Sequence, residues 1–181
     1  MTPYIAILRG INVSGHKIIR MEQLRQSCAA LGFQSVQTYV QSGNIVFVAA
    51  EKSPSALSKR LTEAILHDFG FSVPVVVKTA KEIRNVINSN PLVKEDGIEL
   101  SRLHVTFLAE APSKSALKNL ESLPCKPDRF CVGLREIYLH CPAGYGNTKL
   151  SNTAFEKALS VRATTRNWKT VTALFEMASK L

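Results

Sequence analysis

The sequence lacks an apolar run long enough to cross a membrane. The segment Tyr4–Leu8 is followed at once by Arg9 and is too short for the core of a secretory signal. No later apolar run approaches the roughly 18 residues that a membrane span needs. We therefore expect no membrane partner and a cytoplasmic location.

Cysteine and histidine are few, and their spacing excludes two kinds of site. The four cysteines, Cys28, Cys125, Cys131 and Cys141, form no C-x-x-C pair, so we expect reduced thiols that serve as structural residues. The histidines His16, His67 and His104 have no metal-ligand spacing. The sequence predicts neither a metal site nor a cofactor.

Catalytic patterns are missing as well. His140 and Cys141 are neighbours on a predicted strand, so their side chains point to opposite faces and cannot pair as base and nucleophile. No Ser-His-Asp order stands out, and the short motif of RNA-recognition modules is absent. The sequence therefore indicates a site without indicating a reaction.

The composition is that of a folded protein with a positive surface. The 181 residues are 45% hydrophobic and 20% charged, which fits one large domain or two small ones. The net charge is +9, and residues 113–181 hold 11 basic and 5 acidic side chains. Such a field attracts phosphates, nucleic acid or acidic partners without specifying one of them.

The hydrophobic pattern of residues 1–79 predicts a β-α-β-β-α-β unit. Short apolar runs predict strands near residues 5–8, 36–40, 45–48 and 73–77, and Gln41–Asn44 is the predicted turn of a hairpin. Apolar residues at helical spacing predict a helix ended by Gly32 and another that begins at Ser53-Pro54. This order is typical of ferredoxin-like domains.

Residues 80–181 predict a second, similar unit. Thr79 and Glu82 form the capping box of a helix, and strands follow near residues 103–108, 129–132 and 137–141, with a helix from Ser113 between the first two. Two helices end the chain in this interpretation. We expect an α+β fold of two ferredoxin-like units. Residues 1–79 form a βαββαβ unit, and residues 80–181 form a βαββ unit with two C-terminal helices. In each unit the helices cover one face of an antiparallel sheet, and the two units pack as one body.

Four ordered blocks resemble one known family. They are Leu8-Arg9-Gly10-Ile11-Asn12-Val13, residues 38–47 (TYVQSGNIVF), Gly144-Tyr145-Gly146 with Lys149-Leu150, and Thr165-Arg166-Asn167-Trp168 with Thr170-Val171. Together they resemble the bacterial domain-of-unknown-function 1697 family, which has no assigned activity. Ser14 replaces a second glycine of the family pattern, and Thr148 replaces a serine.

The first block has the chemistry of a phosphate loop. Arg9 and Gly10 follow a strand, Gly10 and Asn12 begin a loop rich in backbone N–H groups, and Lys17 adds a cation. The segment is not a P-loop, because His16 stands where that motif requires lysine. A plain structural turn is the alternative interpretation.

The middle blocks offer further donors. Gln41 and Ser42 are candidate ligand contacts because a hairpin turn alone does not need them, whereas Gly43 and Asn44 also suit a purely structural turn. In the later loop, Tyr145 can stack or hydrogen-bond, and Lys149 is a mobile cation.

The last block precedes the final helix. Thr165 or Asn167 can cap this helix, whose N-terminus carries a partial positive charge. Arg166 is therefore unfavourable there unless an anion binds, and Trp168 is interpreted as a core residue.

The favoured function is binding of a phosphate-bearing small molecule or nucleic acid through a basic cleft. We expect the four blocks to converge at this cleft, around Arg9, Gln41, Lys149 and Arg166. One alternative is an enzyme acting on a phosphorylated or nucleotide-like small molecule, with Glu22, Glu156 or His16 as acid or base. The other is a structural or self-association module.

Overall fold

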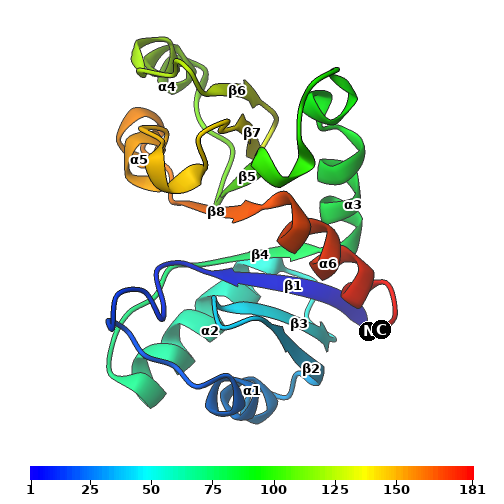
Figure 1. Ribbon diagram of the computed structural model, residues 1–181. Helices are drawn as coiled ribbons and strands as arrows, with labels where there is room; N and C mark the ends of the chain where they lie inside the picture. Colours follow the sequence, from blue (N-terminus) through cyan, green and yellow to red (C-terminus); the bar gives the residue numbers. More distant parts are fainter. The chain divides into compact units, whose positions relative to one another are not determined.

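The computed structural model describes residues 1–181, which divide into two units. The first unit consists of Met1–Asn85 together with the C-terminal residues Ala173–Leu181, and the second consists of Val86–Thr172. Each unit contains one four-stranded antiparallel sheet with helices, as Figure 1 shows. The predicted α+β class is confirmed. No helix is long and apolar enough to cross a membrane.

The first unit has the element order that the sequence predicts. Its elements are β1 (Thr2–Leu8), α1 (Met21–Ala30), β2 (Gln34–Tyr39), β3 (Asn44–Ala49), α2 (Pro54–Phe69) and β4 (Val75–Thr79). The strands lie in the order β2-β3-β1-β4, and all neighbouring pairs are antiparallel. The hairpin between β2 and β3 places residues 40–43 beside the end of β1, where Leu8 N donates to Gly43 O at 2.8 Å.

Helix α2 forms because both of its ends are satisfied. The Ser53 hydroxyl accepts a hydrogen bond from Ala56 N, Pro54 occupies the first turn, and Gly70 ends the helix in the left-handed conformation. The apolar stripe of Leu57 and Leu61 is fully buried. It packs, together with α1, against alternate residues of the sheet such as Tyr4 and Phe47, so both helices cover one face (Figure 1).

The second unit repeats this order. Its strands and helices are β5 (Leu103–Leu108), α4 (Lys114–Lys118), β6 (Arg129–Val132), β7 (Glu136–His140), α5 (Asn152–Leu159) and β8 (Ala163–Asn167), with short 3-10 turns η1 (Pro91–Lys94), η2 (Leu100–Arg102), η3 (Asn119–Ser122) and η4 (Tyr145–Asn147). The strands lie in the order β6-β7-β5-β8. The strand positions thus correspond one to one with those of the first sheet.

Strand β8 is absent from the sequence-based prediction, which interprets residues 163–167 only as the approach to the last helix. The segment contains one apolar residue, Ala163, and has no strand periodicity. It is a strand because it pairs with β5, where Thr106 lies opposite Thr165 and their hydroxyls are 2.7 Å apart. A contact between residues so distant in sequence is invisible to local patterns.

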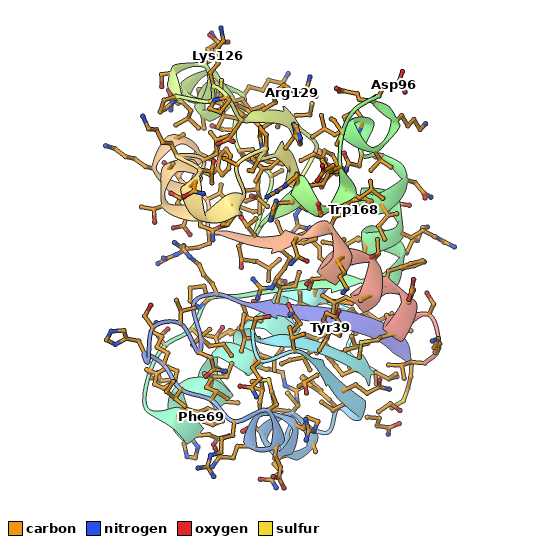
Figure 2. The ribbon with its side chains drawn as sticks, viewed as in Figure 1. Tyr39, Phe69, Asp96, Lys126, Arg129 and Trp168 are labelled. Carbon is orange, nitrogen blue, oxygen red and sulfur yellow. The ribbon has the colours of Figure 1, made fainter.

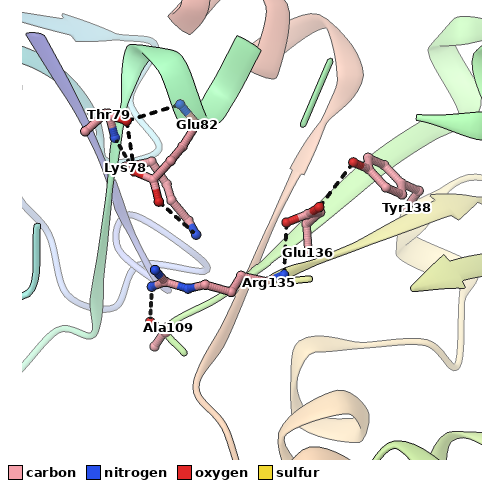
Figure 3. A network of polar contacts seen from close by, with 7 residues as sticks. All are labelled: Lys78, Thr79, Glu82, Ala109, Arg135, Glu136 and Tyr138. Carbon is pink, nitrogen blue, oxygen red and sulfur yellow. Dashed lines mark hydrogen bonds and ion pairs between the residues drawn. The ribbon is translucent and has the colours of Figure 1, made fainter. Parts of the chain in front are cut away.

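Two helices extend across the division of the chain into units. Helix α3 (Ala80–Asn88) begins with the predicted capping box, in which Glu82 Oε2 accepts from Thr79 N at 2.8 Å and Thr79 Oγ1 accepts from Glu82 N at 3.1 Å (Figure 3). Glu82 also lies 3.9 Å from the buried ammonium of Lys78. Helix α6 (Trp168–Ala178) directly follows β8, and Trp168 at its start is buried, as predicted (Figure 2).

Candidate functional site

Seven of the predicted site residues belong to the first unit and five to the second. The first set is Arg9, Gly10, Asn12, Lys17, Gln41, Ser42 and Asn44. The second set is Tyr145, Lys149, Thr165, Arg166 and Asn167. Within each unit, residues that are distant in sequence are brought together.

In the first unit, Asn12 joins the first block to the second. Its Nδ2 donates to Ile19 O at 3.0 Å and to Gln41 O at 2.9 Å, and its Oδ1 accepts from Ile19 N at 2.8 Å. Both ends of the amide therefore hold backbone groups of the protein. Asn12 fixes the shape of the loop between β1 and α1.

The backbone of this loop is unusual. Gly10, Asn12, Ser14, Gly15 and Lys17 all have φ between 48° and 77°, a region that costs most residues energy. Alternation of left-handed with ordinary residues turns successive backbone N–H groups to one side and creates concavities that bind anions. The side chain of Lys17 folds back, and its Nζ donates to Ser72 O at 2.8 Å.

The turn between β2 and β3 separates structural residues from exposed ones. Gly43 has a φ of 73°, and a Cβ atom there would lie 2.6 Å from Leu8 Cβ, so only glycine fits. Asn44 is fully buried and donates to Ser42 Oγ at 2.8 Å. Gln41 and Ser42 are exposed. The structure of the turn thus explains why Gly43 and Asn44 are present. Of the candidate ligand contacts in this turn, the Gln41 side chain is an exposed polar group.

In the second unit, Thr165 and Asn167 serve the structure. Asn167 Oδ1 accepts from Thr170 N at 2.8 Å, which caps helix α6 as predicted. The Thr165 hydroxyl donates to Asn152 Oδ1 at 2.7 Å and also contacts the hydroxyl of Thr106. The contacts of Thr165 hold the middle of β8 against α5 and β5.

Arg166 lies between these two residues on β8, immediately before α6. Its NH1 donates to Thr165 O at 2.8 Å and to Thr164 Oγ1 at 3.2 Å, so the guanidinium lies against the end of its own strand. Burial lowers the pKa of Arg166 to about 10, and the interaction with Tyr145 partly opposes this shift. The structure therefore holds a partly desolvated cation at this point.

Tyr145 forms a stacked pair with His104 of strand β5. The ring centroids are 5.0 Å apart, and the planes differ by 27°. His104 is only 9% exposed, its Nδ1 lies 3.3 Å from Arg102 O, and burial lowers the pKa of the imidazole. The sequence analysis missed His104, although His104 and Thr106 are alternate polar positions of an otherwise apolar strand, a pattern that could have marked them.

Lys149 follows a well-fixed segment of loop. The Thr148 hydroxyl donates to the buried carboxylate of Asp128 and accepts from Leu150 N at 3.0 Å. Asn147 Nδ2 donates to Ala143 O at 2.9 Å. Lys149 itself is exposed. The loop thus places a solvent-facing ammonium after a rigid turn.

Cys28, Cys141 and Glu156 have structural roles or hindered chemistry. Burial raises the pKa of Cys28 to about 12 and that of Cys141 to about 11, so neither thiol ionises near neutrality. Glu156 Oε1 accepts from Ala163 N at 2.9 Å. These observations give no support to a thiolate nucleophile or to Glu156 as an available base.

A polar cluster between α1 and α2 contains the residue types of a catalytic triad, but the aspartate and not the histidine lies between the other two side chains. Asp68 lies in the middle, where it accepts from Ser27 Oγ at 2.5 Å and contacts His67 Nδ1 at 2.7 Å. The hydrogen bonds from His67 and Ser27 lower the pKa of Asp68. Ser27 therefore donates to a weak base, the carboxylate, and histidine does not activate it.

Taken together, these features define the class as an α+β protein of two similar sheets, in which each unit places cationic and amide groups at loops and strand ends. The family described as Protein of unknown function (DUF1697) has a model that matches residues 1–138, and the chain belongs to this family. The predicted membership of this family is thus confirmed. The blocks at Tyr145 and Arg166 lie beyond the matched residues.

A solved structure shares this fold. It is described as a conserved bacterial protein, SP0830, from Streptococcus pneumoniae, and it has a TM-score of 0.74 and 24% sequence identity over 98% of each chain. At this identity, the similarity concerns the fold alone. No curated protein matches the chain.

Proposed function

We propose that this protein binds a small phosphate-bearing ligand through the cationic end of β8 in the second unit. The observation that carries the proposal is the position of Arg166. Arg166 is half-buried and stands two positions before the first residue of α6, close in the chain to the helix end where the dipole adds positive potential. Both burial and the dipole disfavour a cation, and a bound anion compensates for both.

The groups around Arg166 suit a phosphate. A guanidinium offers several N–H donors in a planar fork that matches phosphate oxygens. The exposed Lys149 of the same unit is the candidate for a second positive charge on the ligand. In the first unit, the loop between β1 and α1 independently has the positive-φ backbone of an anion-binding concavity.

A small ligand is favoured over nucleic acid because of burial. Duplex and single-stranded nucleic acids are bound mainly by exposed cations along a groove or stripe. Arg166 is half-buried, and the hydroxyl of the neighbouring Tyr145 is buried as well. A recessed cation can reach the terminal phosphate of a small molecule more easily than the backbone of a long polyanion.

The test is a thermal-shift series with pyrophosphate, ribose 5-phosphate and a single-stranded oligonucleotide, on wild type, Arg166→Ala and Arg162→Ala. Arg162 is an exposed arginine four positions earlier and is the matched control. A phosphate compound at about 100 times its Kd adds about 2.7 kcal/mol to the stability of wild type and of Arg162→Ala. This gain is reduced or lost in Arg166→Ala.

Two results would contradict the proposal. An equal shift in wild type and Arg166→Ala would place the ligand elsewhere. Stabilisation by the oligonucleotide alone, with a steep dependence on salt, would favour nucleic acid over a small ligand.

A further inference from the structure

The loop between β1 and α1 contains a small hairpin, which we call the finger (residues 12–19). His16 N donates to Val13 O at 2.9 Å and closes its turn. The two turn residues, Ser14 and Gly15, have φ of 49° and 77°, as in the tight turns that join antiparallel strands. All four of these residues are exposed, and a Cβ atom added at Gly15 would meet no atom within 4 Å. The tip of the finger therefore projects into open space.

Two side chains fix the finger to its own unit. The Asn12 amide donates to Gln41 O at 2.9 Å, in the turn between β2 and β3. Lys17 Nζ donates to Ser72 O at 2.8 Å, in the loop between α2 and β4. The finger, this turn and this loop therefore lie together at one end of the first sheet (Figure 1). The shape of this end is thus set by contacts within the first unit.

Three aliphatic side chains are exposed at this end of the sheet. Val13 and Ile18 of the finger are each 58% exposed, and Val40 in the adjoining turn is 54% exposed. The nearby Ile11 and Ile19, in contrast, are 2% exposed and belong to the core. A single exposed aliphatic side chain is ordinary, but three on adjoining segments are a candidate apolar contact surface.

The same end contains cations and no acidic side chain. No aspartate or glutamate occurs in any of the three segments, which are residues 9–20, 40–43 and 70–74. The cations of these segments are Lys17 and Arg20, which are exposed, and Arg9, which is half-buried. Exposed aliphatic groups next to acid-free positive charge complement a partner surface that is both apolar and anionic.

We propose that this end of the first unit docks on an anionic lipid surface. The aliphatic side chains of the finger enter the interfacial layer, and the cations lie near the lipid phosphates. A bilayer takes up a projecting tip without a matching groove, and it accommodates both kinds of group at once. A nucleic acid would bind the cations and leave the aliphatic side chains in water.

Docking of this kind needs no membrane-spanning helix. The expectation of no membrane partner rests on the lack of a spanning segment, so it does not bear on contact at the surface of a bilayer. The docking surface belongs to the first unit and uses no residue of the proposed phosphate site at Arg166. Either proposal can therefore fail without the other.

The experiment is co-sedimentation of the full chain with lipid vesicles at low salt. One preparation contains equal parts of phosphatidylcholine and phosphatidylserine, and the other contains phosphatidylcholine alone. Wild type is expected to bind the anionic vesicles at least about 5-fold more tightly, because each cation near an anionic surface contributes about this factor. Added salt is expected to weaken the binding.

Two variants assign the contact to the finger and its cations. Val13→Ser combined with Ile18→Ser is expected to weaken binding about 10-fold, since each buried CH₂ group contributes a factor of about 4. Arg20→Gln is expected to weaken it about 5-fold. The matched control is Leu100→Ser combined with Leu134→Ser, which removes two exposed leucines of the second unit and keeps the binding.

Four results would overturn the proposal. They are equal binding to both vesicle preparations, binding to neither, and an equal loss in the finger variant and its control. The fourth is binding that survives both serine substitutions, falls in Arg20→Gln and is matched by a single-stranded oligonucleotide, which would favour nucleic acid over lipid. If the serine pair fails to fold, Val13→Ser alone and wild type on the two vesicle preparations still decide.

Discussion

Asn12 and Gln41, which are 29 positions apart, are joined by a hydrogen bond of 2.9 Å from the Asn12 amide to the Gln41 carbonyl. The same amide also bonds both backbone groups of Ile19. One side chain thus ties the loop after β1 to the turn after β2. Its role is to hold the two blocks of the first unit together in the folded chain.

Asn12→Ala should therefore destabilise the protein. Three backbone groups lose their partner, and since the site is only half-buried, we expect a loss of about 1–3 kcal/mol in the free energy of unfolding. Urea denaturation measures it. Gln41→Ala is the matched control, because the bond uses the backbone carbonyl of Gln41, which the substitution keeps. Equal effects of the two substitutions would contradict this role of Asn12.

Gly43→Ala tests the close approach between the turn and strand β1. The new Cβ would lie 2.6 Å from Leu8 Cβ and 2.9 Å from Ile11 Cδ1, and the φ of 73° adds strain. We expect a loss of about 2–4 kcal/mol in stability.

Gly15→Ala provides the comparison for Gly43→Ala. Gly15 has a similar φ of 77°, but a Cβ atom added there would have open space around it, with nothing within 4 Å. Its substitution costs only the strain of the left-handed backbone, about 1–2 kcal/mol. Thermal melts of both variants separate strain from overlap, and equal losses would refute the steric argument.

The contrast between β4 and β8 shows what sequence patterns can predict. Strand β4 is rich in β-branched residues around Val76 and is expected from local pattern alone. Strand β8 reads Ala-Thr-Thr-Arg-Asn, and only its pairing with β5 makes it a strand. The helix cap at Asn167 is predictable because capping is local, within three residues of the chain.

The candidate site shows the same limit. The residue types of Asn12 and Asn44 suggest ligand contacts, yet their amides bond the backbone and Ser42, since a buried or half-buried amide must satisfy its own hydrogen bonds. The stacking of His104 on Tyr145 cannot be predicted from local pattern, because the two residues are far apart in sequence. The convergence of all four blocks at one site stays a prediction.

His104 should make stability depend on pH on the acid side. Burial lowers the pKa of its imidazole in the folded protein, so below the ordinary value of about 6.5 the unfolded chain binds more protons. The stabilising contribution is complete above this pH and is lost as the pH falls through the lowered pKa.

His104→Phe keeps an aromatic ring for Tyr145 and removes the titrating group. We expect the variant to lose less stability than wild type between about pH 6.5 and about pH 5, as measured by urea denaturation at each pH. The comparison is made relative to each protein at mildly alkaline pH, so that any change in packing cancels. Parallel pH curves would mean that the imidazole of His104 has the same pKa in the folded and unfolded protein, which would contradict the prediction.

Arg166→Ala separates a binding role from a structural one in the absence of ligand. The substitution removes a partly desolvated cation from the positive end of α6, so the unliganded protein should keep its stability or gain about 0.3–1 kcal/mol. Phosphate affinity should fall, because a charge-assisted hydrogen bond is lost. Arg162→Ala, at an exposed position of the preceding loop, should change neither quantity. A clear drop in the melting temperature of ligand-free Arg166→Ala, with Arg162→Ala unchanged, would contradict the binding role. The guanidinium would then stabilise the fold through its bonds to Thr164 and Thr165, and no anion would be required to explain its position.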